Sequence, residues 1–491
     1  MRPVTISEQT YRDKVYGCWL GKNVGGTLGT PHEGIKEVLE LTFYDPVPDE
    51  PLPNDDLDLQ LVWLKMLQER GIYPTVSDFA DYWVKHLGPY PWNEYGFCRE
   101  NLNRGLRPPI SGCYDNYYID EMGSPIRSEI WACVAAGDPG LAAQLAWTDA
   151  VLDHAGGEGV YGEMFWAALQ AAAFVISDVE TLIGIGLSMI PLHSRISRVI
   201  RDAVWCSNNG VECAEARERV LRSFGHHNPC HAPQNHGFTI IGWLYGEDFG
   251  DKLCKAVNCG YDTDCTGATL GATLGIIGGT AGIPDDWRKP VGEGIVLHKF
   301  TEDLDAPADV TALTDQTVEI GLRMLAERSD ISEIGGADEA PADVLDLLFD
   351  NSRALVALSQ DPQSTIETVE GYDIALHYGG EPVLRPGIAK TVGVSVRRDG
   401  HPVPAQVALS GPGGWSITPA GEMLGQQRFT LRAESVADNN TVTASVTVDG
   451  RQLSAEYLML GPGAAPGFPC GVNVERCPKC HARIESCICG K

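Results

Sequence analysis

The spacing of apolar residues changes character about two-thirds of the way along the chain. Before residue 330 apolar residues recur at helical spacing, as in residues 59–67, which Gly71 closes, and long Ala-rich helices are expected at 140–152, 161–176, 181–190 and 194–205. From 365 to 460, short runs alternate with the period of a β-strand, and turn signals such as Asp399-Gly400 separate them. The pattern predicts an all-α domain followed by an antiparallel β-sandwich of immunoglobulin-like type.

Composition shifts place the domain boundaries. An acidic segment rich in Gly and Pro covers 329–343, a short helix is expected at 344–358, and a second Gly/Pro stretch covers 461–469. We therefore expect four parts: the helical domain at 1–328, a linker with a short helix at 329–364, the β-sandwich at 365–462, and a linker with a Cys-rich tail at 463–491.

The chain is acidic, with 37 Lys and Arg against 66 Asp and Glu and a formal net charge of −29. Without a Lys/Arg cluster, this charge disfavours a nucleic-acid partner, whereas it can supply carboxylate ligands for hard cations. The apolar stretch 266–283 is broken by glycines, and the first residues lack the apolar region of a secretory signal. We expect a cytoplasmic protein that does not bind a membrane.

Two acidic turns each open a predicted helix: Asn-Asp-Asp at 54–56 and Asp-Thr-Asp at 262–264. Taken alone, each turn is explained by helix capping, because acidic and amide side chains bind the free amides of a first helical turn. Together they favour a metal site, because hard divalent cations collect oxygen ligands from separate segments. Gly267, Gly271 and Gly275 lie four residues apart on one helical face, so a second helix can approach closely and hold the two turns together.

Four segments, in order, resemble the ADP-ribosylglycohydrolase family, which includes the bacterial dinitrogenase reductase-activating glycohydrolase. They are the Gly-rich stretch 17–33, the acidic turn 54–56, Asp153-His154 leading into 158–161, and the turn 260–265 with its Gly-rich helix. The resemblance covers residues 10 to 285, and its specificity comes from the ordered combination.

The resemblance implies a compact all-α fold that binds two Mg²⁺ ions, or Mn²⁺ or another divalent metal. The metal ligands it implies are Asn54, Asp55, Asp56, Asp262, Asp264 and Cys265. It also implies a metal-dependent hydrolase that cleaves an N- or O-glycosidic bond to ribose, in a small molecule or an ADP-ribosylated protein. The alternatives are a glycosidase of the same fold that acts on another small glycoside or furanoside, and a catalytically inactive binding protein.

The resemblance also assigns residues around the metals. Glu33 stands at the position of a catalytic glutamate in some members, although it is equally explained as a solvated loop acid; the predicted catalytic set is Glu33, Asp55 and Asp56. The predicted substrate-binding residues, each with an ordinary packing or turn explanation beside it, are Gly123, Ser124, His154, Glu158 and Tyr161.

The sequence departs from the family pattern at several positions. Gly26 replaces the usual Asp, Asn54 and Cys265 each replace a Thr, and Asp153 precedes His154 where the family has Thr. Sulfur is a poor ligand for Mg²⁺, so Cys265 weakens one metal position or makes it selective for a softer ion. These departures bear on the substrate more than on the fold.

Two further clusters contain potential metal ligands. Four tail cysteines within thirteen residues suit a tetrahedral structural Zn²⁺, the alternative being a reduced tail without structure: Cys477, Cys480, Cys487 and Cys489. A histidine-rich segment lacks the repeated spacing of a zinc site, and we interpret it as a loop near the pocket that does not bind a metal: His226, His227, Cys230, His231 and His236.

Overall fold

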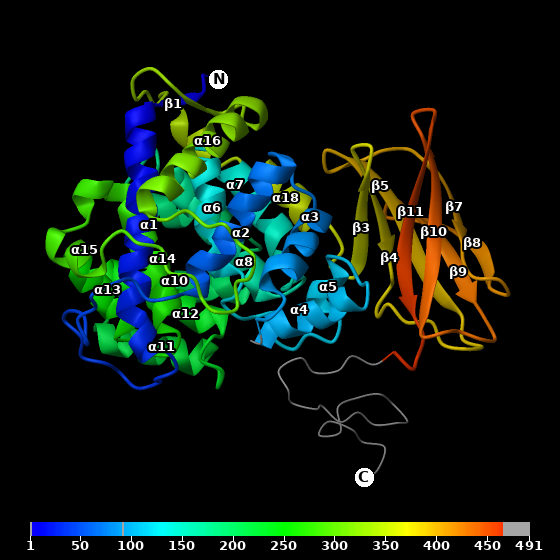
Figure 1. Ribbon diagram of the computed structural model, residues 1–491, viewed down its shortest axis with the longest axis horizontal. Helices are drawn as coiled ribbons and strands as arrows, with labels where there is room; N and C mark the ends of the chain where they lie inside the picture. Colours follow the sequence, from blue (N-terminus) through cyan, green and yellow to red (C-terminus); the bar gives the residue numbers. More distant parts are fainter. Residues whose placement is uncertain (1, 91–92, 465–491) are drawn as a thin grey trace, which may run out of the picture.

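The computed structural model describes residues 2–90 and 93–464, and the predicted zinc ligands of the tail lie outside them. Helices form the larger part of the molecule and strands the smaller part (Figure 1). The helices are α1 (Glu8–Gly29), α2 (Asp55–Arg70), α3 (Val76–Tyr82), α4 (Asn93–Asn103), α5 (Ile110–Cys113), α6 (Ser128–Val134), α7 (Pro139–Ala150), α8 (Glu158–Ala172), α9 (Val179–Ser188), α10 (Arg195–Asn208), α11 (Cys213–Phe224), α12 (Ala232–Tyr245), α13 (Phe249–Val257), α14 (Thr263–Gly278), α15 (Asp285–Val291), α16 (Val310–Arg328), α17 (Val344–Leu348) and α18 (Ser352–Leu358). Short turns of other helical type are η1 (Thr30–His32), the π-helix η2 (Trp83–Leu87), η3 (Pro125–Arg127) and η4 (Thr280–Gly282).

The helices predicted from apolar periodicity are present as α2, α7, α8, α9 and α10, with ends shifted by a few residues. The acidic turn at 54–56 differs in detail, because α2 begins at Asp55 and only Asn54 lies outside it as the N-cap. The helix expected at 344–358 is divided into α17 and α18.

An antiparallel pair of helices, α1 and α14, forms the centre of the helical part. A Cβ added at Gly17, Gly21 or Gly25 would collide with the backbone carbonyl of Gly275, Gly271 or Gly267, respectively. The two backbones therefore touch along one face, which confirms that the glycines of α14 admit a close partner and identifies the partner as α1. The contact places the beginning of α14 beside the end of α1, where Gly29 meets Thr263.

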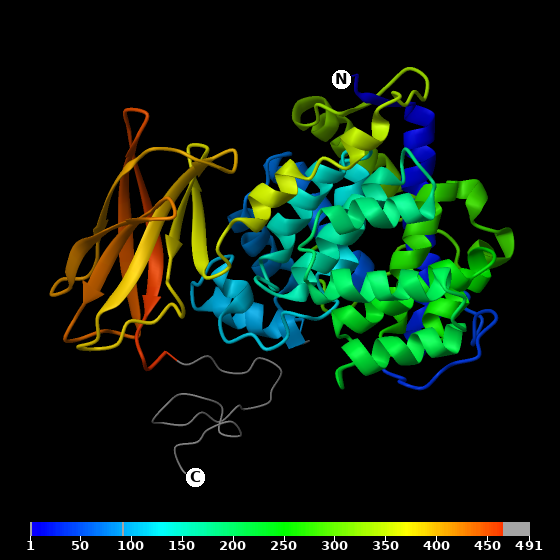
Figure 2. The same cartoon turned by 180° about the vertical axis from the view of Figure 1, so that it is seen from behind.

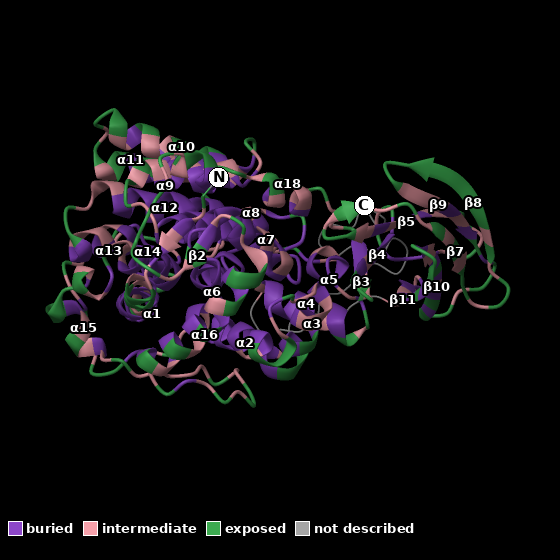
Figure 3. Cartoon of the chain, turned by 90° about the horizontal axis from the view of Figure 1, so that it is seen from above, coloured by how far each residue is buried: buried purple, intermediate pink, exposed green. Residues whose placement is uncertain are grey.

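The C-terminal region contains antiparallel sheets, as the alternating pattern predicted. The strands are β3 (Ser364–Val369), β4 (Tyr372–His377), β5 (Lys390–Arg398), β6 (His401–Pro402), β7 (Gln406–Ser410), β8 (Ser416–Met423), β9 (Gln426–Arg432), β10 (Asn439–Val448) and β11 (Arg451–Leu460). One sheet has the order β3-β4-β5-β9-β8, with β6 beside β5, and the other has the order β11-β10-β7. Apolar side chains of both sheets share one core, while β8 is largely exposed (Figure 3). The immunoglobulin-like type of this region stays a prediction.

The helical and β parts are joined by direct contacts. The amide of Ile366 in β3 donates to the carbonyl of Pro108 at 3.1 Å, and Leu106 and Ile110 belong to the core of the β region. Figure 2 shows α18 leading along the helical part into this junction. The segment predicted as a linker at 329–343 contains β2 (Ser332–Ile334), which pairs in parallel with β1 (Val4–Ile6). Among the described residues, no helix is long and apolar enough to cross a membrane.

Candidate metal centre

The two acidic turns meet in space. Asn54 caps α2 through its carboxamide oxygen, which accepts from the amide of Asp56 at 2.9 Å, and Asp262 directly precedes α14. Asp56, Asp264 and Cys265 each present one potential ligand atom, and these atoms lie within 4.8 Å of one another. Segments separated by about two hundred residues thus converge on one point, where α1 contacts α14 and Lys22 of α1 lies 3.6 Å from Asp56 of α2.

The carboxylates at this point are buried and poorly partnered. One oxygen of Asp56, one of Asp264 and both of Asp262 accept no hydrogen bond from the described residues. Burial raises the pKa of Asp56 to about 7, against the lowering effect of Lys22. Burial, together with the charge of Glu33, raises the pKa values of Asp262 and Asp264 well above normal. Such a set of oxygen donors carries more carboxylates than nearby cations, and it fits hard divalent cations.

Lys22 is a buried cation of this centre that the sequence analysis did not single out. Its Nζ lies 3.6 Å from Asp56 Oδ1 and 3.0 Å from Glu129 Oε2, and it donates to the carbonyl of Ile126. Its charge is therefore shared with Glu129 and does not neutralise the acidic turns. Only its tertiary position on α1 reveals this role.

The two substituted ligand positions are engaged in hydrogen bonds. The thiol of Cys265 donates to Asp56 Oδ2 over 3.6 Å, and burial, with the charge of Asp262, raises its pKa well above the usual value. The oxygen of Asn54 keeps a second lone pair beyond its cap bond, so Asn54 stays a predicted ligand. A Cβ at Gly26 would lie 2.8 Å from the side-chain nitrogen Nδ2 of Asn54, so the glycine leaves space for the Asn54 side chain.

Glu33 approaches the centre from the solvent side. It follows η1, and its carboxylate lies within 4.8 Å of ligand atoms of Cys230 and Asp262. The residue is exposed, yet partial desolvation of its carboxyl group and the charge of Asp55 raise its pKa. The structure therefore brings the predicted catalytic residue Glu33 to the acidic turns.

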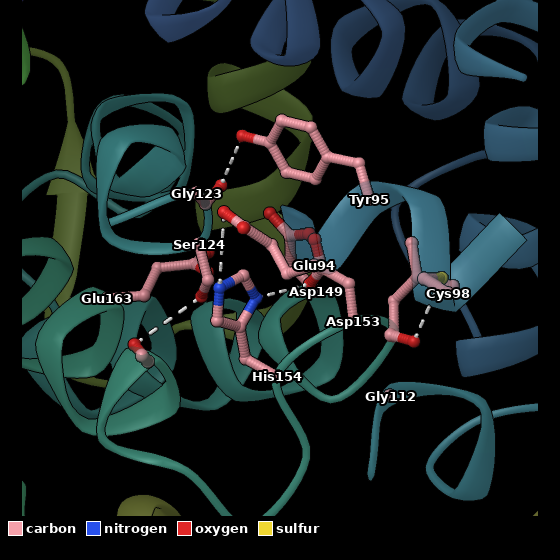
Figure 4. A network of polar contacts seen from close by, with 12 residues as sticks. Glu94, Tyr95, Cys98, Gly112, Gly123, Ser124, Asp149, Asp153, His154 and Glu163 are labelled. Carbon is pink, nitrogen blue, oxygen red and sulfur yellow. Dashed lines mark hydrogen bonds and ion pairs between the residues drawn. The ribbon is translucent and has the colours of Figure 1, made fainter. Parts of the chain in front are cut away.

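A buried network borders the centre (Figure 4). The guanidinium of Arg127 binds Asp149 and Asp153, each at 2.8 Å. His154 lies between Asp153, 2.9 Å from its Nδ1, and Glu94, 3.7 Å from its Nε2. Burial raises the pKa of Glu94 to about 7. His154 is thus held inside the network, and Glu94 is a site residue that no sequence motif indicated.

Other predicted substrate residues differ in how near they come to this centre. The carbonyl of Gly123 accepts from the hydroxyl of Tyr95, which also reaches Asp55 at 3.5 Å. Ser124 is buried, and its hydroxyl donates to Glu163.

The remaining two predicted substrate residues lie on α8. The carboxylate of Glu158 accepts from the amides of Arg195 and Ile196 at 2.7 and 2.9 Å, so it caps α10. Tyr161 is half-buried, and burial raises its pKa. The structure thus gives Glu158 a capping role that accounts for its side chain, and the substrate contacts of both residues stay predictions.

The fold and the acidic centre together define an all-α domain with a potential divalent-metal site, followed by a β-rich region. The profile of the ADP-ribosylglycohydrolase family matches residues 7–317, and the chain belongs to this family. The match runs from the start of α1 into α16 and ends before the β region.

Individual relatives are distant. An uncharacterized protein of Archaeoglobus fulgidus is 26% identical over 310 residues, which cover 60% of this chain and 94% of the relative. A solved structure described as an ADP-ribosylglycohydrolase-related protein complex is 19% identical, with a TM-score of 0.43, and the match covers 64% of this chain and 99% of that one.

Proposed function

We propose that the chain is a divalent-metal-dependent hydrolase that cleaves an N- or O-glycosidic bond to ribose. The observation that carries this proposal is the convergence of Asp56 with Asp264, and of Glu33 with Asp262 beside them, where buried carboxylate oxygens have no hydrogen-bond partner among the described residues. Family membership supports the glycosidic reaction class.

Asp55, Asp56, Asp262 and Asp264 would hold the metal, with Asn54 and Cys265 beside them. Mg²⁺ or Mn²⁺ bound there would orient the ribose hydroxyls and lower the pKa of a water molecule. Their oxygen donors match the preference of these ions.

A carboxylate of the protein would transfer a proton to or from the reacting groups as general acid or base. Desolvation and the charge of Asp55 raise the pKa of Glu33 above its ordinary value, which is the direction in which enzymes tune a glutamate for general acid–base catalysis, and Glu33 lies at the open side of the centre. We assign to Glu33 the general acid or base role. Glu94 lies against His154 and acts as a positioning residue for its ring.

A second candidate substrate class follows from the cations of the centre. Among the described residues, Lys22 and Arg127 enter it, and both are paired with buried carboxylates. Neither is available to a pyrophosphate, and this favours another small glycoside or furanoside as the alternative substrate.

Hydrolysis assays test the proposal on ADP-ribosyl-arginine, ADP-ribosyl-serine and a panel of furanosides, each with Mg²⁺ and with EDTA. We expect product from at least one ribosyl substrate in Mg²⁺ only, and none from Asp264→Asn, whereas Asp286→Asn, an exposed residue of α15, stays active. Hydrolysis that persists in EDTA would overturn metal dependence, and turnover of furanosides alone would select the second candidate.

A further inference from the structure

The loop between α11 and α12 is fixed against a distant segment. The amide of Met122 donates to the carbonyl of Cys230 at 2.8 Å, and that of Ala232 donates to Asp120 at 2.7 Å. These backbone bonds hold His226 and His231, on the loop, beside Glu121. Because 226 − 121 = 105 positions separate Glu121 from His226, the spacing of the histidines alone could not reveal the cluster.

Glu121, His226 and His231 each present a potential ligand atom, and these atoms lie within 4.8 Å of one another. The side chains of Glu121 and His231 are only 3% and 4% exposed. His231 Nδ1 lies 4.0 Å from Glu121 Oε1, which is too long for a hydrogen bond. Glu121 Oε2 and His231 Nε2 have no hydrogen-bond partner among the described residues.

Burying Glu121 and His231 side by side destabilises the fold unless a ligand binds their polar atoms. Burial, then the charge of Glu94, raises the pKa of Glu121 to about 10, while burial, then the charge of Arg195, lowers the pKa of His231 to about 3. Both groups are therefore neutral near pH 7 and form no ion pair. Buried polar atoms without partners destabilise a fold, so a ligand that satisfies them has a clear energetic basis.

We propose that Glu121, His226 and His231 form a binding site for a first-row transition-metal ion of the Zn²⁺ type, separate from the acidic centre. Two imidazoles with one carboxylate suit Zn²⁺ or Co²⁺, whereas the carboxylate-rich centre suits harder ions. The ion would supply the positive charge that ionises Glu121 and would use the nitrogen lone pair of a neutral His231.

His226 is the weakest of the three ligands. Its Nδ1 already accepts a hydrogen bond from the amide of Asn228 at 3.2 Å, and coordination through that atom replaces this bond. Its ring centroid lies 4.5 Å from that of His231, so the ring is near the point that the ligands share. We therefore expect a larger loss of affinity from His231→Ala than from His226→Ala.

The ion would act on the acidic centre through the loop. Cys230 lies next to His231 in sequence, and its thiol belongs to the group formed with Glu33 and Asp262. A metal that joins His231 to Glu121 therefore fixes one wall of the centre. The ion would position the loop segment that carries Cys230. Metal binding by Glu121, His226 and His231 does not depend on the proposed hydrolase activity.

Zn²⁺ binding to the full chain tests the site after its metals have been removed. Serine replaces Cys477, Cys480, Cys487 and Cys489, so that tail thiolates contribute nothing, and excess Mg²⁺ occupies the acidic centre. Removal of a residue that only hydrogen-bonds to a metal ligand already lowers metal affinity by about 10–100-fold. Removal of a ligand itself should cost more, so we expect Glu121→Gln and His231→Ala to weaken Zn²⁺ binding at least about 100-fold. His227→Ala, which changes the neighbouring histidine, is the matched control and should bind as the parent does.

A parent that binds no Zn²⁺ would overturn the proposal, and so would unchanged binding in His231→Ala or a loss seen only in Asp264→Asn. A second measurement does not require the variants to fold. Crystals of the unsubstituted chain soaked in Zn²⁺ should show an anomalous peak between Glu121 and His231, and the absence of a peak there contradicts the site.

Discussion

At the residue scale, the buried carboxylates of the acidic centre lower the stability of the fold. Asp56, Asp262 and Asp264 are buried, and oxygens of all three accept no hydrogen bond from the described residues. Such groups persist in a fold when they serve binding or catalysis, because their burial opposes folding. Two single residues can be tested directly: Cys265 for its effect on Mg²⁺ affinity, and Glu94 for its effect on the pH dependence of stability.

Cys265→Thr should strengthen Mg²⁺ binding. A hydroxyl oxygen is a harder ligand than a thiol, so we expect the Mg²⁺ concentration for half-maximal binding to fall on the order of tenfold. Isothermal titration calorimetry measures this change. Cys265→Ala offers no donor atom and should not tighten binding; equal affinities in the Thr and Ala variants would show that residue 265 does not face the ion.

Glu94 should make stability depend on pH. Its folded pKa is raised from 4.5 to about 7, so folding is penalised once the unfolded chain ionises. The contribution of Glu94 to the free energy of unfolding is fully present below pH 4.5. It is lost as the pH rises to about 7, and the free energy of unfolding then falls by about 3 kcal/mol.

Urea unfolding between pH 5 and pH 8 measures this effect, as the difference between the parent and Glu94→Gln, for which the loss should disappear. Glu180→Gln, an exposed residue in the first turn of α9, serves as the control. Parallel pH profiles of the parent and Glu94→Gln would remove Glu94 as the cause.

At the element scale, the contact of α1 with α14 decides whether the site exists. Asp264 lies at the start of α14, and Asp56, on α2, lies 3.6 Å from Lys22 of α1, so movement of α14 away from α1 would separate the two carboxylates. The contact tolerates no side chain at its glycines. Gly21→Ala places a methyl group against the backbone of Gly271, which cannot relax as a flexible side chain does. We expect a destabilisation of about 3 kcal/mol and loss of divalent-metal binding.

Gly278→Ala is the matched control, because an added Cβ there, at the end of the partner helix α14, meets nothing within 4 Å. It should be neutral or slightly stabilising, since alanine favours a helix over glycine. Thermal unfolding compares the two variants. Equal melting temperatures for Gly21→Ala and the parent would contradict the close backbone contact.

The helices and the acidic turns could be predicted from the sequence because their signals are local. Apolar periodicity marks α2 and α8, and a Gly-x-x-x-Gly pattern marks the close face of α14. Glu94 and Glu121 could not be predicted, because each comes from a segment without a motif. Lys22 lies within the Gly-rich stretch 17–33, but nothing local to it indicates its role. Only the packing of distant elements brings these three residues to their sites.

At the scale of the whole molecule, the β region is built onto the helical part. Leu106 is completely buried in the core of the β region, although it comes from the chain between α4 and α5. A shared core couples the unfolding of the two parts, so calorimetry of the parent should show a single transition.

Leu106→Asp should divide that transition in two, because a buried charge in this core costs at least about 3 kcal/mol. The control Leu192→Asp changes an exposed leucine and should leave one transition. Two transitions in the unsubstituted chain would contradict the coupling.

We expect Asp56, Asp262 and Asp264 to bind divalent metal together. Anomalous diffraction from crystals of the parent and of Asp264→Asn, both soaked in Mn²⁺, measures this binding. The parent should show a strong Mn²⁺ peak between these carboxylates, and the peak should be lost or markedly weaker in Asp264→Asn. No peak at this place in the parent, or an undiminished peak in the variant, would show that these carboxylates do not form a metal site.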